Sequence, residues 1–327
     1  MVRQMQATGP TISIITPCLN AAQFLRRALD SVLNQGYQNL EHIVVEGGST
    51  DGSLEILARY PHIRLVRARS QGVYESLNQG LSISSGQIIG QLNADDEYEL
   101  GALAAAAKAF AEDEYLDAFC GGAVVTDGGR IVRDCRGPKQ RQLSFDAGLL
   151  GTPIINAKFF RREFLNKLNG YDPSYRLLAD RDLLVRAILV GCRWKDNDQL
   201  LYRYRIHPSS LTHNYSPQAM KQLTEESLVL STRWLAEPSA PPALRRVCRI
   251  RYGKSILRLL FFALRERTPT DIFHAFRALV SYQGRLSWRP SAYAVRAFCA
   301  WMNGDNSMFM AGGAELEPTR ISRNGAA

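Results

Sequence analysis

The chain has 327 residues, 46% of them hydrophobic and 22% charged, a composition typical of a globular protein with one large α/β domain and an appendage. Its six cysteines include no Cys-x-x-Cys pair, which excludes the usual zinc-binding spacings and a disulfide framework and indicates a reducing compartment. Residues 1–10 lack the apolar core of a signal peptide, and no apolar run is long enough to span a bilayer, so we expect a cytoplasmic protein, soluble or peripheral to the membrane.

The net charge of +9 is concentrated toward the C-terminal part of the sequence. Residues 243–300 carry twelve lysines and arginines against two acidic residues, a surplus of +10 that leaves the rest of the chain near −1. An anionic partner is therefore expected to bind this part of the chain. No nucleic-acid-binding motif accompanies the charge, so nucleic acid is not among the expected partners.

Short β-branched runs alternate with helical spacings over the first hundred or so residues. The pattern predicts strands at residues 11–16, 41–45, 63–67 and 87–92. It predicts helices at residues 21–35, after the capping residues 47–52, at 73–83, and from residue 97 into the alanine-rich stretch that follows. Strands and helices that alternate at this pitch indicate an α/β fold with a mostly parallel sheet covered by helices.

The segment Asn93-Ala94-Asp95-Asp96 directly follows the last of these strands. Carboxylates at the C-terminal end of a strand lie where open α/β sheets bind ligands. Asp95 and Asp96 repel each other when both are ionised, and a divalent cation such as Mn²⁺ or Mg²⁺ would hold both charges in place. A turn followed by a helix start explains the two aspartates equally well, because aspartate favours both.

The common phosphate-binding loops are absent from the sequence. Thr-Pro-Cys-Leu-Asn follows the first strand in place of Gly-x-Gly-x-x-Gly, and no Gly-x-x-x-x-Gly-Lys-Ser/Thr motif occurs. A nucleotide diphosphate would therefore need another counter-charge, which a cation held at Asp95 and Asp96 would supply.

Four segments of the N-terminal part stand out together. They are residues 14–25 (IITPCLNAAQFL), 30–41 (DSVLNQGYQNLE), 48–53 (GSTDGS) and 86–96 (GQIIGQLNADD). In this order they resemble a family 2 glycosyltransferase with the GT-A fold, and the resemblance extends over roughly residues 11–210. The forms Gly-Gly-Ser, Gly-Val-Tyr-Glu-Ser-Leu-Asn-Gln-Gly and Leu-Asn-Ala-Asp-Asp are similar to those of bacterial enzymes that build surface polysaccharides.

The resemblance implies a nucleotide-sugar donor bound across the N-terminal half, with a divalent cation between its diphosphate and the carboxylates of Asp95 and Asp96. The donor-binding residues that it implies are Thr16, Pro17, Leu19, Asn20, Glu46, Gly72, Asn78, Asn93, Ala94 and Asp95. The chain departs from the family at Asn93 and Gly47, where many relatives have aspartate, and at Leu77, where many have arginine. Because of these departures, the resemblance does not indicate which base and which sugar the donor carries.

The second half of the resemblance supplies the acceptor side. Residues 152–162 and 170–182 are similar to the segments around the acceptor helix of the family, which implies that Asp180 is the general base. Independently of the family, Asp180 directly precedes the apolar face of a helix, and the dipole near that N-terminus favours the carboxylate form that a base requires. An ordinary N-cap explains Asp180 equally well. Asp182 is interpreted as an acidic residue of the first helical turn.

His207 follows a predicted strand that contains Arg203 and Arg205. The corresponding histidine of some relatives contacts the metal or the diphosphate, which implies a metal-ligand role here, whereas an isolated histidine is more often structural. Arg203 and Arg205 lie on one face of the strand and are predicted to meet either phosphate or solvent.

The sequence predicts a GT-A domain (residues 1–235), a basic helical extension (236–310) and a flexible tail (311–327). The Pro-rich segment 237–242 is interpreted as a hinge-like linker, followed by helices at 244–264 and 272–282. Basic amphipathic helices suit an anionic membrane surface, and they suit equally well a helical pair packed on the catalytic domain.

These features together predict an inverting, metal-dependent glycosyltransferase that moves a sugar from a nucleotide-sugar to a glycan acceptor. The resemblance implies a lipid-linked acceptor in bacterial polysaccharide biosynthesis, at the inner face of the cell membrane. An enzymatic alternative is a nucleotidyltransferase that makes the nucleotide-sugar, but it would need a glycine-rich basic loop after the first strand. A non-enzymatic alternative is a sugar-nucleotide-binding scaffold without catalysis, and the intact Asp95, Asp96 and Asp180 argue against it.

Overall fold

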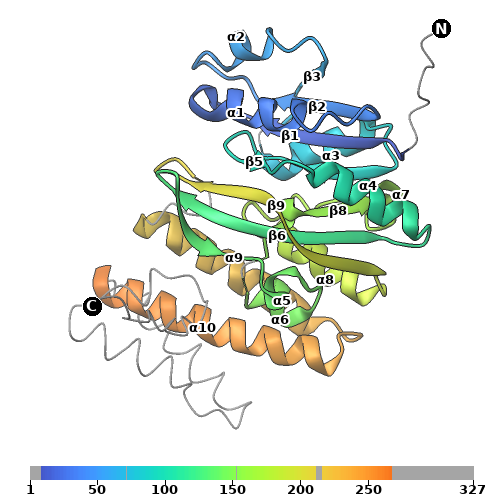
Figure 1. Ribbon diagram of the computed structural model, residues 1–327. Coiled ribbons are helices and arrows are strands. Elements are labelled where there is room, and N and C mark those ends of the chain that lie inside the picture. Colours follow the sequence, from blue (N-terminus) through green and yellow to red (C-terminus); the bar gives the residue numbers. More distant parts are fainter. Residues whose placement is uncertain (1–8, 71, 152, 211–215, 267–327) are drawn as a thin grey trace, which may run out of the picture.

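The computed structural model describes residues 9–70, 72–151, 153–210 and 216–266 (Figure 1). The strands are β1 (Ile12–Cys18), β2 (Leu40–Glu46), β3 (Ile63–Arg67), β4 (Ile88–Gln91), β5 (Glu97–Tyr98), β6 (Ala118–Asp127), β7 (Arg130–Asp134), β8 (Lys158–Arg161) and β9 (Trp194–Ile206). The helices are α1 (Ala22–Leu33), α2 (Ser53–Leu57), α3 (Val73–Ile83), α4 (Ala102–Glu112), α5 (Pro138–Arg141), α6 (Phe145–Leu149), the 3-10 helix η1 (Ile155–Ala157), α7 (Arg162–Lys167), α8 (Ala179–Leu189), α9 (Pro217–Ala236) and α10 (Pro242–Glu266). The predicted helix at 272–282 and the predicted tail from residue 311 lie outside the described residues.

One mixed sheet organises the described part of the chain. Its strand order is β3-β2-β1-β4-β8-β6-β9-β5, and β7 pairs with β6 beside this path. β1 runs parallel to β2 and β4, β2 runs parallel to β3, and β6 runs parallel to β9. β8 is antiparallel to both β4 and β6. The expected mostly parallel sheet covered by helices is confirmed, and the parallel strands bring their carboxyl ends to one edge.

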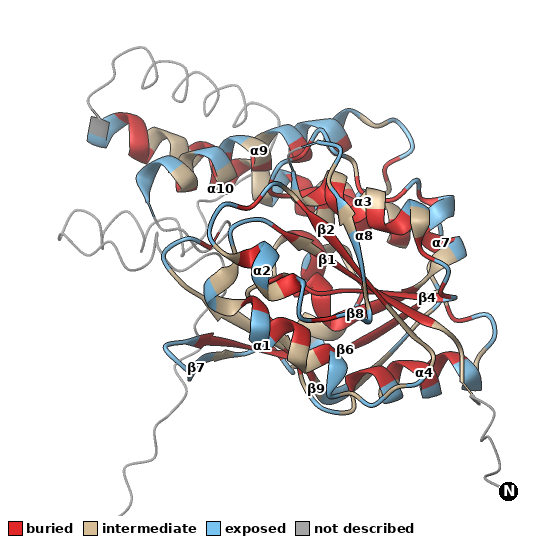
Figure 2. Cartoon of the chain, turned by 90° about the horizontal axis from the view of Figure 1, so that it is seen from above, coloured by how far each residue is buried: buried red, intermediate tan, exposed pale blue. Residues whose placement is uncertain are grey.

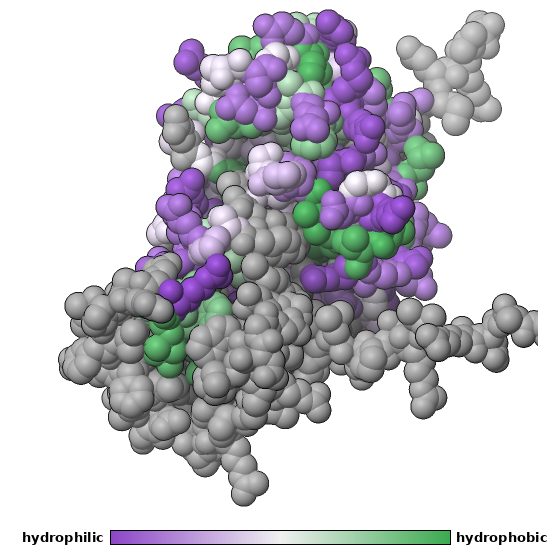
Figure 3. Space-filling view, turned by 90° about the vertical axis from the view of Figure 1, so that its left-hand side faces the viewer, coloured by the Kyte–Doolittle hydropathy of each residue, from purple (hydrophilic) through white to green (hydrophobic). Residues whose placement is uncertain are grey.

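Helices cover both faces of the sheet because the strand side chains alternate between two apolar layers. Ile12 and Ile14 pack into the layer that contains α1 and α4, whereas Ile15 packs into the layer that contains α3, α7 and α8. The central strands are buried, and the helices that flank them expose their outer faces (Figure 2). On one side of the molecule, hydrophilic side chains cover most of the upper, N-terminal part (Figure 3).

The prediction of a helix from residue 97 is wrong at its start. Glu97 and Tyr98 form β5, which pairs antiparallel with Arg203 and Tyr202 of β9, and α4 begins only at Ala102. The Tyr98 hydroxyl donates a hydrogen bond to the Gln91 carbonyl at 2.8 Å in the buried core. The spacing of apolar residues around position 97 does not indicate this pairing, because β9 is distant in sequence.

The Pro-rich segment before α10 forms a turn that hydrogen bonds hold together. Arg245 donates hydrogen bonds of 2.7–3.2 Å to four carbonyl oxygens of this turn, those of Leu235, Glu237, Pro238 and Ala240. Because one guanidinium satisfies four carbonyls, the angle between α9 and α10 is held in place.

α10 packs against the apolar layer beneath the sheet. It contacts α9 and α6, and Figure 1 shows α9 and α10 together below the sheet. Leu244, Val247 and Cys248 are fully buried in the same apolar layer as α8. The boundary at residue 235 stays a prediction. Within the described ranges, no helix combines the length and the apolar character needed to cross a lipid bilayer.

Candidate active site

The loops that follow β1 and β2 are joined at the carboxyl edge of the sheet. The backbone N–H of Asn20 donates to Ser49 Oγ at 2.9 Å, and the N–H of Thr50 donates to Asn20 Oδ1 at 2.9 Å. Asn20 has a left-handed backbone conformation (φ 50°), which asparagine tolerates better than most residues. Leu19 is 55% exposed beside this junction and follows the half-buried Pro17. These two residues offer an apolar surface at the predicted nucleoside position.

Glu46 ends β2 with its carboxylate turned into the following loop. It accepts hydrogen bonds from the backbone N–H groups of Gly48 at 2.9 Å and Ser49 at 2.5 Å. Burial opposes its ionisation, but the hydrogen bonds from Ser49 and Gly48 and the charge of Arg67 outweigh burial and hold the pKa of Glu46 below its ordinary value. Glu46 therefore presents a stable negative charge at this edge.

Thr16 lies inside the sheet. Its side chain is fully buried, and Oγ1 lies 3.0 Å from Nε2 of His42 on β2. Burial lowers the pKa of His42 to about 3, so the imidazole is neutral at physiological pH. Its Nδ1 atom has no hydrogen-bond partner among the described residues. The Thr16 side chain thus supports the strand, and only its backbone approaches the edge.

Asp96 is buried beneath the turn that follows β4. Its Oδ2 accepts hydrogen bonds from Asn93 Nδ2 at 3.0 Å and from the Tyr202 hydroxyl at 2.8 Å. Its Oδ1 accepts the backbone N–H of Arg205 at 2.7 Å. Burial raises the pKa of Asp96 well above its ordinary value, and the negative charge of Asp95 adds to the shift. Both oxygens of Asp96 are thus engaged with protein donors, and the side chain ties this turn to β9.

Asp95, unlike the buried Asp96, is partly exposed and contacts His207. The structure places Asp95 Oδ2 2.8 Å from His207 Nε2, although the two residues are 112 positions apart. His207 Nδ1 lies 2.9 Å from Ser209 Oγ, and the imidazole packs against the ring of Phe24 at 4.4 Å between centroids. The carboxylate is partly exposed, whereas the imidazole is mostly covered. An oxygen atom and a nitrogen atom that could bind a metal ion thus lie side by side. Ala94, which directly precedes Asp95, is buried.

Arg203 and Arg205 are engaged in ion pairs. Arg203 Nε donates to Glu99 Oε1 at 2.9 Å, and Arg205 forms an ion pair with Glu97. Arg205 Nε also donates to the Asp95 carbonyl at 3.1 Å. Glu97 of β5 and Glu99, which directly follows this strand, thus provide the acidic partners of these two guanidinium groups.

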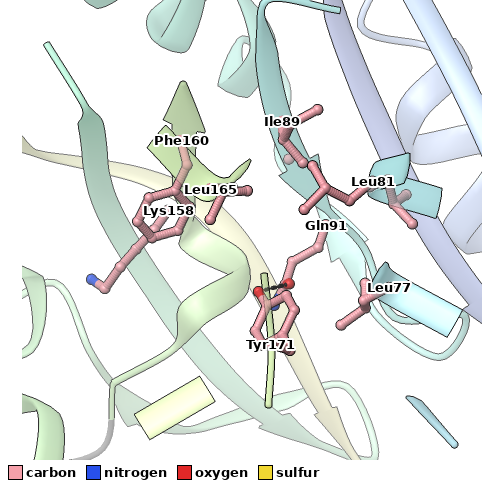
Figure 4. A pocket seen from close by; sticks show the side chains of 10 residues that line it. Leu77, Leu81, Ile89, Gln91, Lys158, Phe160, Leu165 and Tyr171 are labelled. Atoms are coloured by element: carbon pink, nitrogen blue, oxygen red, sulfur yellow. Dashed lines mark hydrogen bonds between the residues drawn. The ribbon is translucent and has the colours of Figure 1, made fainter. Parts of the chain in front are cut away.

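Asn78 links α3 to the segment that precedes α8. Its Oδ1 accepts the Tyr171 N–H at 2.8 Å, and its Nδ2 donates to the Tyr171 carbonyl at 2.7 Å. The Tyr171 hydroxyl in turn donates to Gln91 Oε1, and Figure 4 shows these two side chains pointing toward each other in a small cavity. That cavity has room for about one water molecule. Gly72 lies directly before α3 as its N-cap. Asn78 therefore positions the segment that precedes α8.

Asp180 lies in the first turn of α8, as predicted. Its Oδ1 accepts the N–H of Arg181 at 2.8 Å and lies 3.3 Å from the hydroxyl of Tyr74, which belongs to the first turn of α3. Burial raises the pKa of Asp180, and the positive charge of Arg181 offsets only part of the shift. The helix-dipole argument expected the charged form to be favoured at this position. Burial outweighs the dipole here and makes Asp180 a stronger proton acceptor once it is ionised.

Asp182 has a structural environment, although it is close to Asp180 in sequence. It is fully buried and accepts hydrogen bonds from Arg186 Nε at 2.7 Å and from Trp234 Nε1 at 3.2 Å. These contacts connect α8 to α9, which agrees with its interpretation as a first-turn acid without a catalytic role.

Three side chains of the site were not singled out from the sequence. Tyr74 contacts Asp180, Tyr202 contacts Asp96, and Phe24 packs on His207. Tyr74 stood in a family-like segment at the start of a predicted helix, which was a usable signal. Phe24 likewise stood in a family-like segment, residues 14–25. Tyr202 carried no such signal, because its contact with Asp96 depends on which strands become neighbours.

A family model described as glycosyl transferase family 2 matches residues 13–168 of the chain. A Mycobacterium tuberculosis protein named "PGL/p-HBAD biosynthesis glycosyltransferase" is 32% identical over 207 residues, which are 60% of this chain and 74% of that protein. The chain belongs to glycosyl transferase family 2. The glycosyltransferase predicted from the sequence is thereby confirmed at the level of the family.

Solved structures support the fold of this family 2 member. The S. aureus TarS fragment 1–349 in complex with UDP-GlcNAc aligns with a TM-score of 0.54 at 17% identity, over 85% of this chain and 93% of that one. The mannosyltransferase PcManGT from Pyrobaculum calidifontis, in complex with GDP-Man and Mn²⁺, aligns with a TM-score of 0.57 at 18% identity, over 92% of this chain and 82% of that one. The GT-A fold expected from the sequence is confirmed.

Proposed function

We propose that this family 2 member is an inverting glycosyltransferase that moves a sugar from a nucleotide-sugar to a hydroxyl group of a glycan acceptor. The observation that carries the proposal is the environment of Asp180. It is a half-buried carboxylate in the first turn of α8, beside Tyr74 of α3, and burial raises its pKa. A general base works best when its pKa is closer to the working pH than that of a free carboxylate.

Asp180 accepts the proton of the attacking acceptor hydroxyl. Within the described residues, the Arg181 N–H and the Tyr74 hydroxyl both approach Oδ1, so Oδ2 is the oxygen that takes the proton. The hydroxyl oxygen bonds to the anomeric carbon of the donor sugar as the bond to the nucleoside diphosphate breaks. One such displacement from the face opposite the leaving group inverts the anomeric configuration.

The donor nucleoside is assigned to the joined loops after β1 and β2. Leu19 and Pro17 supply apolar surface there, and Asn20 holds the loops together. Glu46 Oε2 accepts a backbone hydrogen bond from the Gly48 N–H, and a carboxylate oxygen can accept a further hydrogen bond from a base or ribose. UDP-GlcNAc and GDP-Man, which the two solved neighbours bind, are the first donors to test.

Asp95 and His207 are the residues that we assign to a divalent cation. Within the described chain, no three His, Cys, Asp or Glu side chains cluster as a complete metal site. A pair of protein ligands suits Mg²⁺ or Mn²⁺ shared with substrate phosphates, because such ions often take only one or two protein ligands. Both Asp96 oxygens already accept protein hydrogen bonds, so Asp96 is assigned to holding the turn, a change from the expectation that both aspartates bind the ion. When bound, the cation stabilises the negative charge of the leaving diphosphate.

The acceptor is proposed to be lipid-linked and presented at an anionic membrane face. The support is the surplus of +10 in residues 243–300, against a nearly neutral remainder of the chain.

The proposed reaction is tested with purified protein and a panel of UDP- and GDP-sugars, with Mn²⁺, Mg²⁺ or EDTA. We expect metal-dependent release of nucleoside diphosphate, and a transferred sugar whose anomeric configuration by NMR is opposite to that of the donor. Asp95→Asn should lower nucleoside diphosphate affinity in Mn²⁺ to the level measured in EDTA, whereas replacement of the exposed Asp198 by Asn should not. Release from no donor, full activity in EDTA or a retained configuration would each contradict the corresponding part of the proposal.

A further inference from the structure

Three arginines gather beside Asp180 from two helices. Arg181 follows Asp180 in α8, and Arg251 and Arg258 lie about two turns apart on one face of α10. Arg181 donates to the carbonyl oxygens of Gly148 at 2.7 Å and Gly151 at 3.2 Å, at the C-terminal end of α6.

Arg251 reaches the same end of α6 from the other side. It donates to the carbonyl oxygen of Leu149, and its second terminal nitrogen donates to Ser227 Oγ at 2.6 Å. The guanidinium groups of Arg181 and Arg251 therefore end on neighbouring carbonyls. The partial negative charge at a helix C-terminus attracts cations, which explains how two like charges are held together here.

The cluster has more positive charge than the protein around it neutralises. Burial, followed by repulsion from Arg181 and Arg258, lowers the pKa of Arg251 well below its ordinary value. Asp180 attracts Arg181 and Arg251, while Glu226, another acid close to Asp180, accepts the backbone N–H of Leu177 at 2.7 Å.

Two arginines of the cluster have donor groups without an acceptor among the described residues. Arg251 Nε is buried without a hydrogen-bond partner, and Arg258 makes no hydrogen bond or ion pair, in each case within the described residues. A buried N–H without an acceptor costs about 1–3 kcal/mol, so such a group signals an acceptor that binds from outside.

We propose that Arg181, Arg251 and Arg258 form a phosphate-binding subsite for the acceptor next to Asp180. The planar fork of guanidinium donors matches phosphate oxygens, and three positive charges against one carboxylate suit an anion that carries one to two charges. A phosphate group seated here would hold a hydroxyl of the same acceptor molecule within reach of Asp180. This inference deepens the proposed function and rests on it for the role of Asp180.

The position of the cluster separates it from the predicted donor diphosphate. The Asp95–His207 pair packs against Phe24 of α1, which covers one face of the sheet. α8 and α10 belong to the apolar layer on the other face. The phosphate that binds the arginines is therefore assigned to the acceptor and not to the donor.

The subsite is tested by isothermal titration calorimetry, in which inorganic phosphate is titrated into the full chain in EDTA at low ionic strength. Arg258→Gln is the most informative variant, because Arg258 makes no hydrogen bond within the described residues whose loss would disturb the fold. We expect it to weaken phosphate affinity about tenfold or more, the effect of losing a charge-assisted hydrogen bond. Arg258→Lys should retain part of the affinity. Arg249→Gln removes the same charge from the opposite face of α10 and should leave the affinity within about twofold.

Four outcomes separate the possibilities. Wild-type protein that does not bind phosphate, or Arg258→Gln with undiminished affinity, overturns the subsite. An equal loss of UDP affinity in Mn²⁺ would assign the arginines to the donor diphosphate and overturn the acceptor assignment. Phosphate binding that depends on Arg258, in a protein that releases nucleotide from no donor, would leave the subsite standing and contradict the proposed function.

Discussion

At the scale of single residues, Asp180 and His42 show opposite effects of the same burial. Desolvation disfavours the charged form of any side chain, so it raises the pKa of the Asp180 carboxyl and lowers that of the His42 imidazole to about 3. The Asp180 shift serves the proposed chemistry. The His42 shift affects only stability, because this imidazole lies within the sheet and contacts Thr16.

Replacing Asp180 with asparagine is expected to separate donor binding from transfer. Asn keeps the shape of the side chain and can still accept from Tyr74, but it cannot take a proton. Nucleoside diphosphate affinity should persist while transfer falls roughly 10²–10⁴-fold. In the wild-type protein, transfer should fall as the pH drops through the raised pKa of Asp180, because the base must be ionised. Near-normal turnover by Asp180→Asn would show that another group takes the proton.

His42 is expected to make the protein less stable in mild acid. The folded-state pKa of about 3 lies below the ordinary value of 6.5, so the unfolded chain binds a proton that the folded chain does not when the pH is below 6.5. The free energy of unfolding should therefore drop by about 1 kcal/mol between pH 7 and pH 5.5 from this residue alone. Urea denaturation at both pH values measures it. His42→Gln should lose this pH-dependent drop in the free energy of unfolding, whereas replacement of the exposed His62 by Gln should keep most of it. If the free energy of unfolding changes equally with pH in the wild-type protein and both variants, the assignment to His42 is wrong.

At the scale of elements, α10 has two tasks in one helix. Its first turns complete the apolar layer beneath the sheet through Leu244 and Val247. Further along, Arg251 and Arg258 bring positive charge to Asp180. The predicted alternatives for this helix were membrane binding and packing on the catalytic domain, and its described part packs.

Shortening one buried side chain of α10 should destabilise the catalytic domain itself. Leu244→Ala removes buried methyl groups from a fully enclosed site, so the free energy of unfolding should fall by about 2–5 kcal/mol. Leu264→Ala, at a position 39% exposed on the same helix, should change it by less than about 0.5 kcal/mol. Thermal or urea denaturation of both variants provides the test. If both variants lower the free energy of unfolding by the same small amount, the packing of α10 does not stabilise the core.

At the scale of the whole molecule, the charge surplus divides between internal contacts and the surface. Arg245 binds the turn carbonyls, Arg246 pairs with Asp146 at 2.8 Å, and Arg251 lies in the site cluster. Several of the positive charges that suggested a membrane surface are thus paired with groups of the protein itself. Five further arginines of the basic segment, at positions 267, 277, 285, 289 and 296, lie outside the described residues.

Those five arginines are expected to govern binding to anionic membranes. Each basic residue near an anionic leaflet contributes about 1 kcal/mol, so replacing all five with glutamine should weaken binding to phosphatidylserine-containing vesicles by two orders of magnitude or more. High salt should weaken binding of the full chain in the same way, and neutral phosphatidylcholine vesicles are the control. Cosedimentation measures the effect. If the full chain does not cosediment with anionic vesicles at low salt, the membrane hypothesis is wrong.

The sequence by itself determined the elements whose residues are neighbours in the chain. Alternating apolar spacings indicated β1 to β4 and the helices between them, and the short motifs located Asp95 and Asp180 at the ends of their elements. Only the tertiary structure decided that residues 97 and 98 form a strand and that Asn78 holds Tyr171. It also turned Asp96 inward and Asp95 toward His207, and brought Arg251 beside Asp180. The physical reason is that strand and helix periodicity is set by local backbone geometry, whereas hydrogen-bond partners and burial depend on contacts between residues far apart in the sequence.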